Sequence, residues 1–240
     1  MRFDIITIFP NLFKSFTSEA LIARAIKKRI IKITAHDLRK YTRDNHKTVD
    51  GRPYGGGAGM VMLVEPILKA IKALRKLKVN APHRRTRRRG GKSRVILFSA
   101  KGKKFNQATA KRWTRYDQLI MICGRYEGID DRVAQYIVDE EASVGDYVLF
   151  GGEVPAMVVM EAVTRLLPGA VGKEESIRNE SFVENLLEHP HYTRPEVIAI
   201  GGKQRRVPKV LLSGNHKLIE NWRSEHSEKM TKKNRPDLLK

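Results

Sequence analysis

The chain has 240 residues, of which 41% are hydrophobic, and this composition is that of a folded chain rather than a disordered one. Its 47 Lys and Arg residues outnumber its 26 Asp and Glu residues, and the resulting formal net charge of +21 favours a polyanionic partner. The single cysteine, Cys123, excludes a disulfide framework and a zinc site made of several cysteines, so we expect a reducing, cytoplasmic environment.

Short β-rich runs alternate with helical patterns along the first two thirds of the chain. The helical patterns contain Ile67, Ile71 and Leu74 behind Pro66, and Met157 to Leu166 behind Pro155. The β-rich runs are predicted at residues 3–9, 30–34, 94–98, 118–123 and 136–139. Several runs are continuously apolar, as are parallel strands that are buried on both faces. We therefore predict an α/β fold with a parallel sheet, in which ligands bind at the carboxyl ends of the strands.

A change in composition near residue 168 predicts a second domain. The segment PGAVGKEESIRNESFVE has glycine, charge and little periodicity. We predict a ligand-binding domain at 1–168, a flexible linker at 169–184 and a small helical domain at 185–240. In this last domain an amphipathic helix is expected from Lys217 to about Thr231.

Charge is distributed unevenly. Residues 84–104 contain ten Lys and Arg residues and no acidic residue, whereas residues 124–184 contain thirteen acidic and five basic residues. This contrast predicts an outer surface that binds phosphate and a separate site with other chemistry. No apolar run approaches the ~20 residues of a membrane span, and the first residues do not have the pattern of a signal peptide, so we expect no membrane partner.

Three glycine-rich turns stand out: RPYGGGAGM (52–60), CGRYEG (123–128) and SVGDYVLFGGEVPAM (143–157). None matches a P-loop or a dinucleotide-binding pattern. They offer unblocked backbone groups beside apolar walls, as a planar heterocycle such as adenine requires. Taken singly, each turn is better explained as structural than as functional.

Taken with FSAKG (98–102), HYTRP (191–195) and VPKVLLSGNH (207–216), these turns resemble the signature series of the bacterial tRNA (guanine-N1)-methyltransferases. The resemblance runs in order from residue 3 to about residue 239. It implies methyl transfer from S-adenosyl-L-methionine to N1 of the guanosine directly 3′ of the anticodon, position 37 of tRNA. It also implies a trefoil-knotted (SPOUT) domain, which is a rare exception to the rule against knots, and a homodimer whose active sites are shared between subunits.

The resemblance assigns donor binding to three knot loops, 98–102, 124–127 and 144–149, together with the start of the following helix. The implied donor-binding residues are Phe98, Ser99, Gly102, Gly124, Tyr126, Glu127, Val144, Gly145, Asp146, Tyr147, Val148, Leu149, Gly151, Gly152 and Pro155.

Methylation of guanine N1 needs a base, because N1 carries a proton at neutral pH, and a cation or donor for the charge that moves toward O6. Arg165 matches the position of the family's arginine near O6; alone, it is also explained as a cation favoured at a helix end. The family's catalytic Asp-Ser-Phe triplet is here Glu180-Ser181-Phe182. Glutamate has the same functional group with one more methylene, so we predict Glu180 as the base, with Glu184 and Glu174 as fallbacks and a solvated linker acid as the alternative.

Two further departures from the family pattern are Ala100, where the family has proline, and the basic segment RRTRRRGGK at 84–92. Loss of a proline leaves the unbound loop less rigid but removes no chemical group. The basic segment is expected to bind tRNA phosphates.

RNA contacts are implied for two sets of residues. Asp50, Arg52 and Tyr54 are expected to shape the guanosine pocket, while the second set lies in the RNA-binding half of the family: Arg194, Ser213, Asn215 and His216. Magnesium assistance is also implied, but neither a carboxylate cluster nor the spacing of the histidines predicts a protein metal site.

Two alternatives remain open from the sequence. One is a related knotted methyltransferase that acts on ribosomal RNA or on a ribose hydroxyl, and the other is a catalytically inactive RNA-binding protein. Only the replacement at Glu180 favours the inactive protein.

Overall fold

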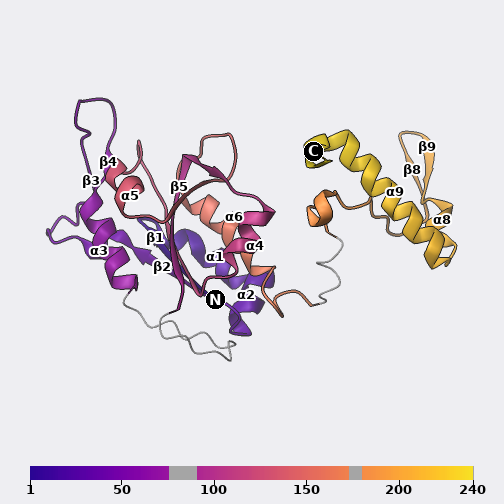
Figure 1. Ribbon diagram of the computed structural model, residues 1–240, viewed down its shortest axis with the longest axis horizontal. Helices are drawn as coiled ribbons and strands as arrows, with labels where there is room; N and C mark the ends of the chain where they lie inside the picture. Colours follow the sequence, from indigo (N-terminus) through magenta and orange to yellow (C-terminus); the bar gives the residue numbers. More distant parts are fainter. Residues whose placement is uncertain (76–90, 173–179, 240) are drawn as a thin grey trace. The chain divides into compact units, whose positions relative to one another are not determined.

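The computed structural model describes residues 1–75, 91–172 and 180–239, which fall into two compact units, Met1–Gly172 and Lys173–Lys240 (Figure 1). Most of the basic segment 84–92, the fallback base Glu174 and the middle of the predicted linker lie outside the described residues.

The first unit contains a five-stranded parallel sheet in the order β2-β1-β6-β5-β7, and a small antiparallel pair, β3–β4. Its elements are β1 (Arg2–Thr7), η1 (Pro10–Leu12), α1 (Phe13–Ser18), α2 (Ala20–Lys27), β2 (Lys32–Asp37), η2 (Leu38–Tyr41), β3 (Asp50–Gly51), β4 (Val61–Met62), α3 (Val64–Arg75), β5 (Ser93–Lys104), α4 (Gln107–Trp113), β6 (Gln118–Ile122), α5 (Asp131–Tyr136), β7 (Glu140–Ser143) and α6 (Glu153–Thr164).

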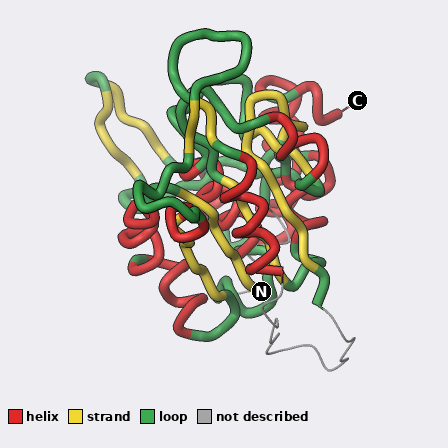
Figure 2. Tube along the Cα trace, turned by 90° about the vertical axis from the view of Figure 1, so that its left-hand side faces the viewer, coloured by secondary structure: helices red, strands yellow, loops and turns green. Residues whose placement is uncertain are grey.

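Helices cover both faces of this sheet, as the strands (yellow) between helices (red) in Figure 2 show. Side chains alternate along each strand, so Leu119 and Met121 of β6 pack toward α1, α2, α4 and α6, while Ile120 and Ile122 pack toward α3 and α5. All four are fully buried. The continuous apolar runs in the sequence are therefore strands buried on both faces, and the predicted α/β class with a parallel sheet is confirmed.

One buried carboxylate lies within this sheet. Asp4 of β1 is fully buried. Its carboxylate accepts hydrogen bonds from Arg2 and from the amide of Gln118, and it also bonds to Nε2 of His36, each at 2.7 Å. Burial alone would raise the pKa of Asp4, but these hydrogen bonds and the charge of Arg2 outweigh it and lower the pKa below the ordinary value.

The prediction of a strand at 136–139 was wrong. Tyr136 ends α5, and the edge strand β7 begins only at Glu140. The Glu140 carboxylate accepts hydrogen bonds from Arg94, Arg112 and the indole of Trp113, which stabilise an acidic residue in a strand. The runs predicted at 3–9, 30–34, 94–98 and 118–123 do correspond to strands, and both predicted helices are present as α3 and α6.

The pairing of strand β5 with β7 shifts register partway along the strand. Phe98 pairs with Ala142 of β7, residues 99–102 leave the ladder, and Lys103 then pairs with the same Ala142. The chain passes very close to β7 where it returns, because a Cβ on Gly102 would lie 2.5 Å from the backbone of Ala142. Only glycine fits this crossing without movement of the backbone.

The second unit contains η3 (Val183–Asn185), the antiparallel hairpin β8 (Val197–Ile200) and β9 (Lys203–Arg206), α8 (Lys209–Leu212), α9 (His216–Asn234) and η4 (Pro236–Leu239). The predicted helix at 217–231 is confirmed within α9. The sequence analysis did not predict the hairpin. Trp222 of α9 stacks on His226 at 3.9 Å between ring centroids and contacts the ring of Tyr192, so aromatic packing supports this small unit.

Within the described ranges, no helix has the length and apolar character needed to cross a membrane.

Candidate functional site

A pocket of about 350 Å³ opens at the carboxyl ends of β5, β6 and β7, and its volume lies within the usual range for small-molecule sites. All but two of the residues predicted for donor binding line it: Phe98, Ser99, Gly124, Tyr126, Glu127, Val144, Gly145, Tyr147, Val148, Leu149, Gly151, Gly152 and Pro155. The irregular part of β5 and the glycine-containing loops that follow β6 and β7 thus come together at one edge of the sheet, where a parallel sheet binds its ligands.

The two exceptions are Gly102 and Asp146. Gly102 contributes the crossing next to Ala142 instead of a pocket wall. Asp146 points to the surface, where its carboxylate lies 2.5 Å from the Nζ atom of Lys104 and its side chain is 79% exposed. These two residues shape the loops around the pocket from outside.

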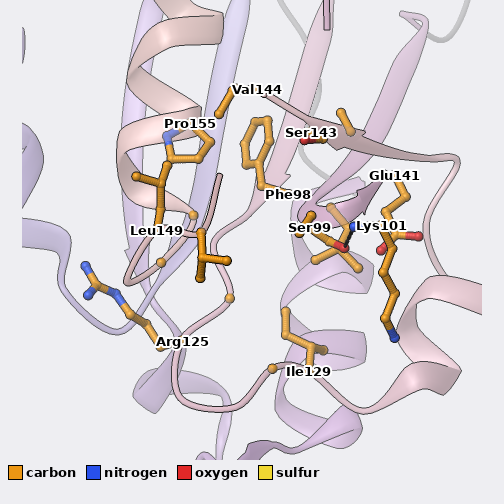
Figure 3. Close-up of a pocket in the computed structure, with 18 of the residues that line it drawn as sticks. Phe98, Ser99, Lys101, Arg125, Ile129, Glu141, Ser143, Val144, Leu149 and Pro155 are labelled. Atoms are coloured by element: carbon orange, nitrogen blue, oxygen red, sulfur yellow. Dashed lines mark hydrogen bonds between the residues drawn. The ribbon is translucent and has the colours of Figure 1, made fainter. Parts of the chain in front are cut away.

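Apolar groups face one another across the pocket. Phe98, Leu149 and Pro155 lie on one side, and Ile129 reaches toward them from the turn after β6 (Figure 3). The walls could therefore hold a flat ring between them, while the exposed backbone of the loops offers hydrogen-bonding groups.

The charged groups that line the pocket are mainly acidic. The lining contains three acidic residues, Glu127, Asp131 and Glu141, and two basic residues, Lys101 and Arg125. Glu141 and Lys101 lie on the same side of the pocket in Figure 3. This excess of carboxylates suits a ligand that carries positive charge.

The glycine-rich loop between β3 and β4 is joined to this pocket. The backbone N–H of Glu127 donates to the carbonyl of Met60 at 3.0 Å, and that of Met62 donates to Gly128 at 3.0 Å. Three predicted RNA-contacting residues are on this hairpin: Asp50 in β3, the exposed Arg52 and the fully exposed Tyr54. They are held close to the turn that lines the pocket, and nothing packs over the Tyr54 ring.

A buried ionic network connects the start of α6 to the end of β1 and to the loop after β6. Glu153, 1% exposed, accepts a hydrogen bond from the Thr7 hydroxyl at 2.7 Å and one from Arg125 Nε at 2.9 Å. The Arg125 guanidinium also lies over the ring of Phe9, 4.9 Å from its centroid. A Cβ on the neighbouring Gly152 would lie 2.6 Å from the Cα of Cys123, so α6 begins in direct contact with the end of β6.

Arg165 follows the last residue of α6 and is exposed. Its backbone N–H donates to Glu161 at 3.2 Å, which makes it the C-cap residue. Helix α6 separates Arg165 from the N-cap residue at its pocket end, Gly152, by about 20 Å at 1.5 Å per residue. Within one chain, therefore, Arg165 lies away from the pocket.

Glu180 is half-buried at the start of a turn in the second unit. Its carbonyl accepts the backbone N–H of Val183 at 3.1 Å, and the Ser181 hydroxyl accepts the N–H of Glu188 at 3.0 Å. The Arg235 guanidinium lies over the ring of Phe182, with its carbon 5.7 Å from the ring centroid. Residues 180–184 of the predicted linker are thus attached to the second unit, with the fallback Glu184 inside η3.

The remaining RNA-contacting candidates also lie in the second unit. The Asn215 side chain caps α9 by accepting the N–H of Leu218 at 3.2 Å, and the Ser213 hydroxyl donates to Val210 at 2.7 Å. His216 is the exposed first residue of α9, and Arg194 is exposed before Pro195. Capping explains Ser213 and Asn215 structurally, and their proposed RNA contacts stay a prediction.

A family model described as "tRNA (Guanine-1)-methyltransferase TrmD" matches residues 1–240 of this chain. The chain belongs to this family. Curated relatives named tRNA (guanine-N(1)-)-methyltransferase cover it completely: that of Endomicrobium trichonymphae is 46% identical over its whole length, and those of Carboxydothermus hydrogenoformans and Listeria monocytogenes are 48% and 43% identical with 88% and 92% of their own length covered.

Membership of the tRNA (guanine-1)-methyltransferase family confirms the resemblance that the signature segments indicated. Fold and family therefore agree on a methyltransferase that modifies tRNA. Lys101 and Arg125 lie inside the predicted loops 98–102 and 124–127, although neither was singled out as a donor-binding residue. Sequence reasoning missed Ile129, Asp131 and Glu141. The first two follow the predicted turn at 123–128, and the wrong position predicted for the edge strand hid Glu141.

In the described part of this family member, no group of three or more His, Cys, Asp and Glu side chains could hold a metal ion. His189 and His191 pack against each other at 4.6 Å, and His191 Nε2 lies 2.9 Å from Glu188. These contacts give the two histidines a structural role, and magnesium assistance stays a prediction of the resemblance.

Proposed function

We propose that this chain transfers the methyl group of S-adenosyl-L-methionine to N1 of the guanosine directly 3′ of the anticodon of tRNA, position 37. The observation that carries this proposal is the pocket made by residues 97–101 of β5 and by the loops after β6 and β7, in a chain that belongs to the tRNA (guanine-1)-methyltransferase family. Because tRNA is a cytoplasmic substrate, we also propose a cytoplasmic location.

The pocket residues fit the methyl donor. Phe98, Leu149 and Pro155 provide apolar contacts for the adenine ring, and the loop backbones provide its hydrogen bonds. The donor is cationic at its sulfonium and its ammonium group, which suits a lining in which Glu127, Asp131 and Glu141 exceed the basic side chains. When bound, the donor supplies an electrophilic methyl group with a neutral thioether as leaving group.

Glu180 is proposed as the base that accepts the N1 proton of guanine. Its carboxylate takes the proton as the N1 electron pair forms the bond to the methyl carbon, and the pair of the broken C–S bond stays on sulfur. Arg165 donates to O6, where negative charge increases as N1 loses its proton. Attachment of Ser181 and Phe182 to the second unit supports this role, since it fixes the backbone on one side of Glu180.

Two observations support a homodimer with shared active sites. Val148 and Phe150 are 91% and 96% exposed beside the pocket, and an exposed row on α6 runs from Val154 through Val158 to Arg165. Val154 and Val158 are four positions apart and Val158 and Arg165 are seven apart, and both spacings keep residues on one face of a helix. A two-fold axis through this row would set two copies of α6 antiparallel, and it would bring each Arg165 toward the pocket end of the other copy.

The trefoil knot is part of the same proposal. The absence of pairing with β7 at residues 99–102 of β5 and the close passage of Gly102 against Ala142 are what a chain crossing near the donor requires. Asp50, Arg52 and Tyr54 are proposed to receive the target guanosine, with Tyr54 stacking on a base, and Arg194 and His216 to contact RNA in the second unit.

Methyl transfer to an unmodified tRNA transcript tests the proposal. We expect incorporation of one methyl group per transcript, and loss of incorporation when adenosine replaces the guanosine 3′ of the anticodon. Primer extension should stop at that nucleotide, because N1 methylation blocks Watson–Crick pairing. Methylation of the adenosine-substituted transcript, of a ribose hydroxyl or of ribosomal RNA alone would contradict the assignment, as would donor binding without any transfer.

A further inference from the structure

The hairpin β8–β9 stands out from the rest of the second unit because it buries neither face. Ile198, Ile200 and every residue of β9 are exposed, and only Val197 is partly covered. Its tip is the two-residue turn Gly201–Gly202, with φ angles of 58° and 72°. An isolated two-stranded hairpin is marginally stable in water, so a hairpin of this kind is expected to gain stability from a partner.

The charge of this hairpin is entirely positive. Lys203, Arg205 and Arg206 lie on β9, and neither strand contains an acidic residue. Among the described residues, no ion pair involves these three side chains, whereas Arg235 and Lys232 of the same unit are each paired with a carboxylate. Three cations without an ion pair among the described residues are available to a polyanion.

The register places these cations on both faces of the ribbon. Arg205 is opposite Ile198 and Lys203 is opposite Ile200, while Arg206 is opposite Val197. Directly opposed residues share a face, and faces alternate along a strand, so Lys203 and Arg205 lie on one face and Arg206 lies on the other. A ribbon with cations on both faces suits a groove that has phosphates on either side better than it suits a flat anionic surface.

We propose that the β8–β9 hairpin inserts into the minor groove of a tRNA stem, where Lys203 and Arg205 contact the phosphates of one strand and Arg206 those of the other. The minor groove of A-form RNA is wide and shallow, whereas its major groove is too narrow for protein side chains. Ribbons of two β-strands lie in nucleic-acid grooves in other proteins. This inference rests on the proposed function and names the part of the substrate that the second unit reads: the shape of a stem, without base specificity.

The experiment measures the affinity of the full chain for an unmodified tRNA transcript by fluorescence anisotropy at several salt concentrations. In the test variant Lys203→Gln, Arg205→Gln and Arg206→Gln are combined. Each lost phosphate contact lowers the slope of log K against log salt by about 0.7 to 0.9, so we expect the slope to fall by about 2 to 3. The matched control combines Lys229→Gln, Lys232→Gln and Lys233→Gln on α9, which removes the same charge from the same unit, and we expect its slope to change by less than about 1.

A second variant separates charge from folding. Exchange of the cations, Lys203→Arg with Arg205→Lys and Arg206→Lys, keeps every charge and should retain the slope and the affinity of the parent. We also expect the glutamine variant to raise KM for tRNA while kcat and the affinity for S-adenosyl-L-methionine stay unchanged. Retained secondary structure, checked by circular dichroism, must accompany these results.

Three results would overturn the inference. They are an unchanged slope in the β9 variant, an equal loss in the α9 control, which would indicate diffuse electrostatic attraction, and a change in association state of the RNA-free β9 variant, which would indicate a protein interface. Failure of the proposed function is distinguishable, because the parent chain would then bind tRNA without methylating it.

Discussion

Gly102→Ala tests whether the passage of the chain against β7 builds the pocket. An added Cβ would lie 2.5 Å from the backbone carbon and nitrogen of Ala142, where ordinary contact needs at least 3.4 Å. Neither side can give way by rotating a side chain, so about 1 Å of backbone movement is required. Overpacking typically costs about 1 to 3 kcal/mol, and a clash with backbone belongs at the upper end, about 3 kcal/mol.

The corresponding fall in Tm is about 6 to 12 °C, because 1 kcal/mol shifts a domain of this size by roughly 2 to 4 °C. Trp113 is fully buried in the first unit, so its fluorescence in a Trp222→Phe background reports the unfolding of that unit alone. Donor affinity, measured by calorimetry below the Tm, should fall at least ~10-fold, since residues 98–101 line the pocket directly before the clash.

Gly172→Ala is the matched control. Its Cβ would meet nothing within 4 Å, so stability and donor affinity should both stay at the values of the parent. If Gly102→Ala melted at the temperature of the parent and bound donor equally well, close passage at Ala142 would not support the pocket.

Further predictions concern the base, the buried network, the buried acid and the dimer. Glu180→Gln should lower kcat by about 10²- to 10⁴-fold with tRNA and donor affinities retained, and Glu180→Asp should keep much of the activity; full turnover by the Gln variant would exclude Glu180 as base. Glu153→Gln should cost about 2 to 3 kcal/mol in urea unfolding, below the range for a fully buried pair because Arg125 keeps 21% exposure. Burial would raise the pKa of Asp4, but its hydrogen bonds outweigh burial and lower the pKa in the folded state. The ionised carboxylate therefore stabilises the fold above the ordinary pKa of about 3.9, and this stabilisation is lost as the pH falls toward the folded-state pKa. Asp4→Asn should flatten that part of the curve of stability against pH. Val158→Glu should give a monomer in sedimentation with little residual turnover, and a monomer with full activity would refute shared active sites.

Elements in which local pattern and tertiary packing agree were predictable from the sequence. The run QLIMI at 118–122 is apolar at all positions after Gln118, and in the structure it is the central strand β6, buried on both faces. The glycines after it predicted a ligand edge, and the pocket is there. Spacing between apolar residues also sufficed for α3, whose Ile67, Ile71 and Leu74 are all buried.

Elements that depend on distant partners were not predictable. The strand β7 begins with two glutamates, which look unfavourable until Arg94, Arg112 and Trp113 are placed around Glu140, and these donors come from other elements. The apolar residues Ile137 and Val138 led to a strand being predicted before Glu140, because they pack against the core without belonging to a strand. In the hairpin, β9 is wholly polar, so only the Gly201–Gly202 pair signalled a turn.

The site was predictable as a set of loops but not as a geometry. A list of residues cannot show that Arg165 lies one helix length from the pocket, or that Asp146 turns outward to Lys104. The resemblance supplied the roles proposed for Glu180 and Arg165, and the length of α6 shows that Arg165 lies away from the pocket of its own chain.

The hydrogen bond between Thr7 and Glu153 joins residues 146 positions apart, and it has a consequence for biosynthesis. The pocket walls come from segments that end at Pro155, so a nascent chain released before that residue has β1, β5 and β6 but no complete site. The pocket is therefore completed late, after all five strands of the sheet have been synthesised. Stalled or truncated products should be inert toward the donor, and the cell would be spared partial enzymes that sequester it.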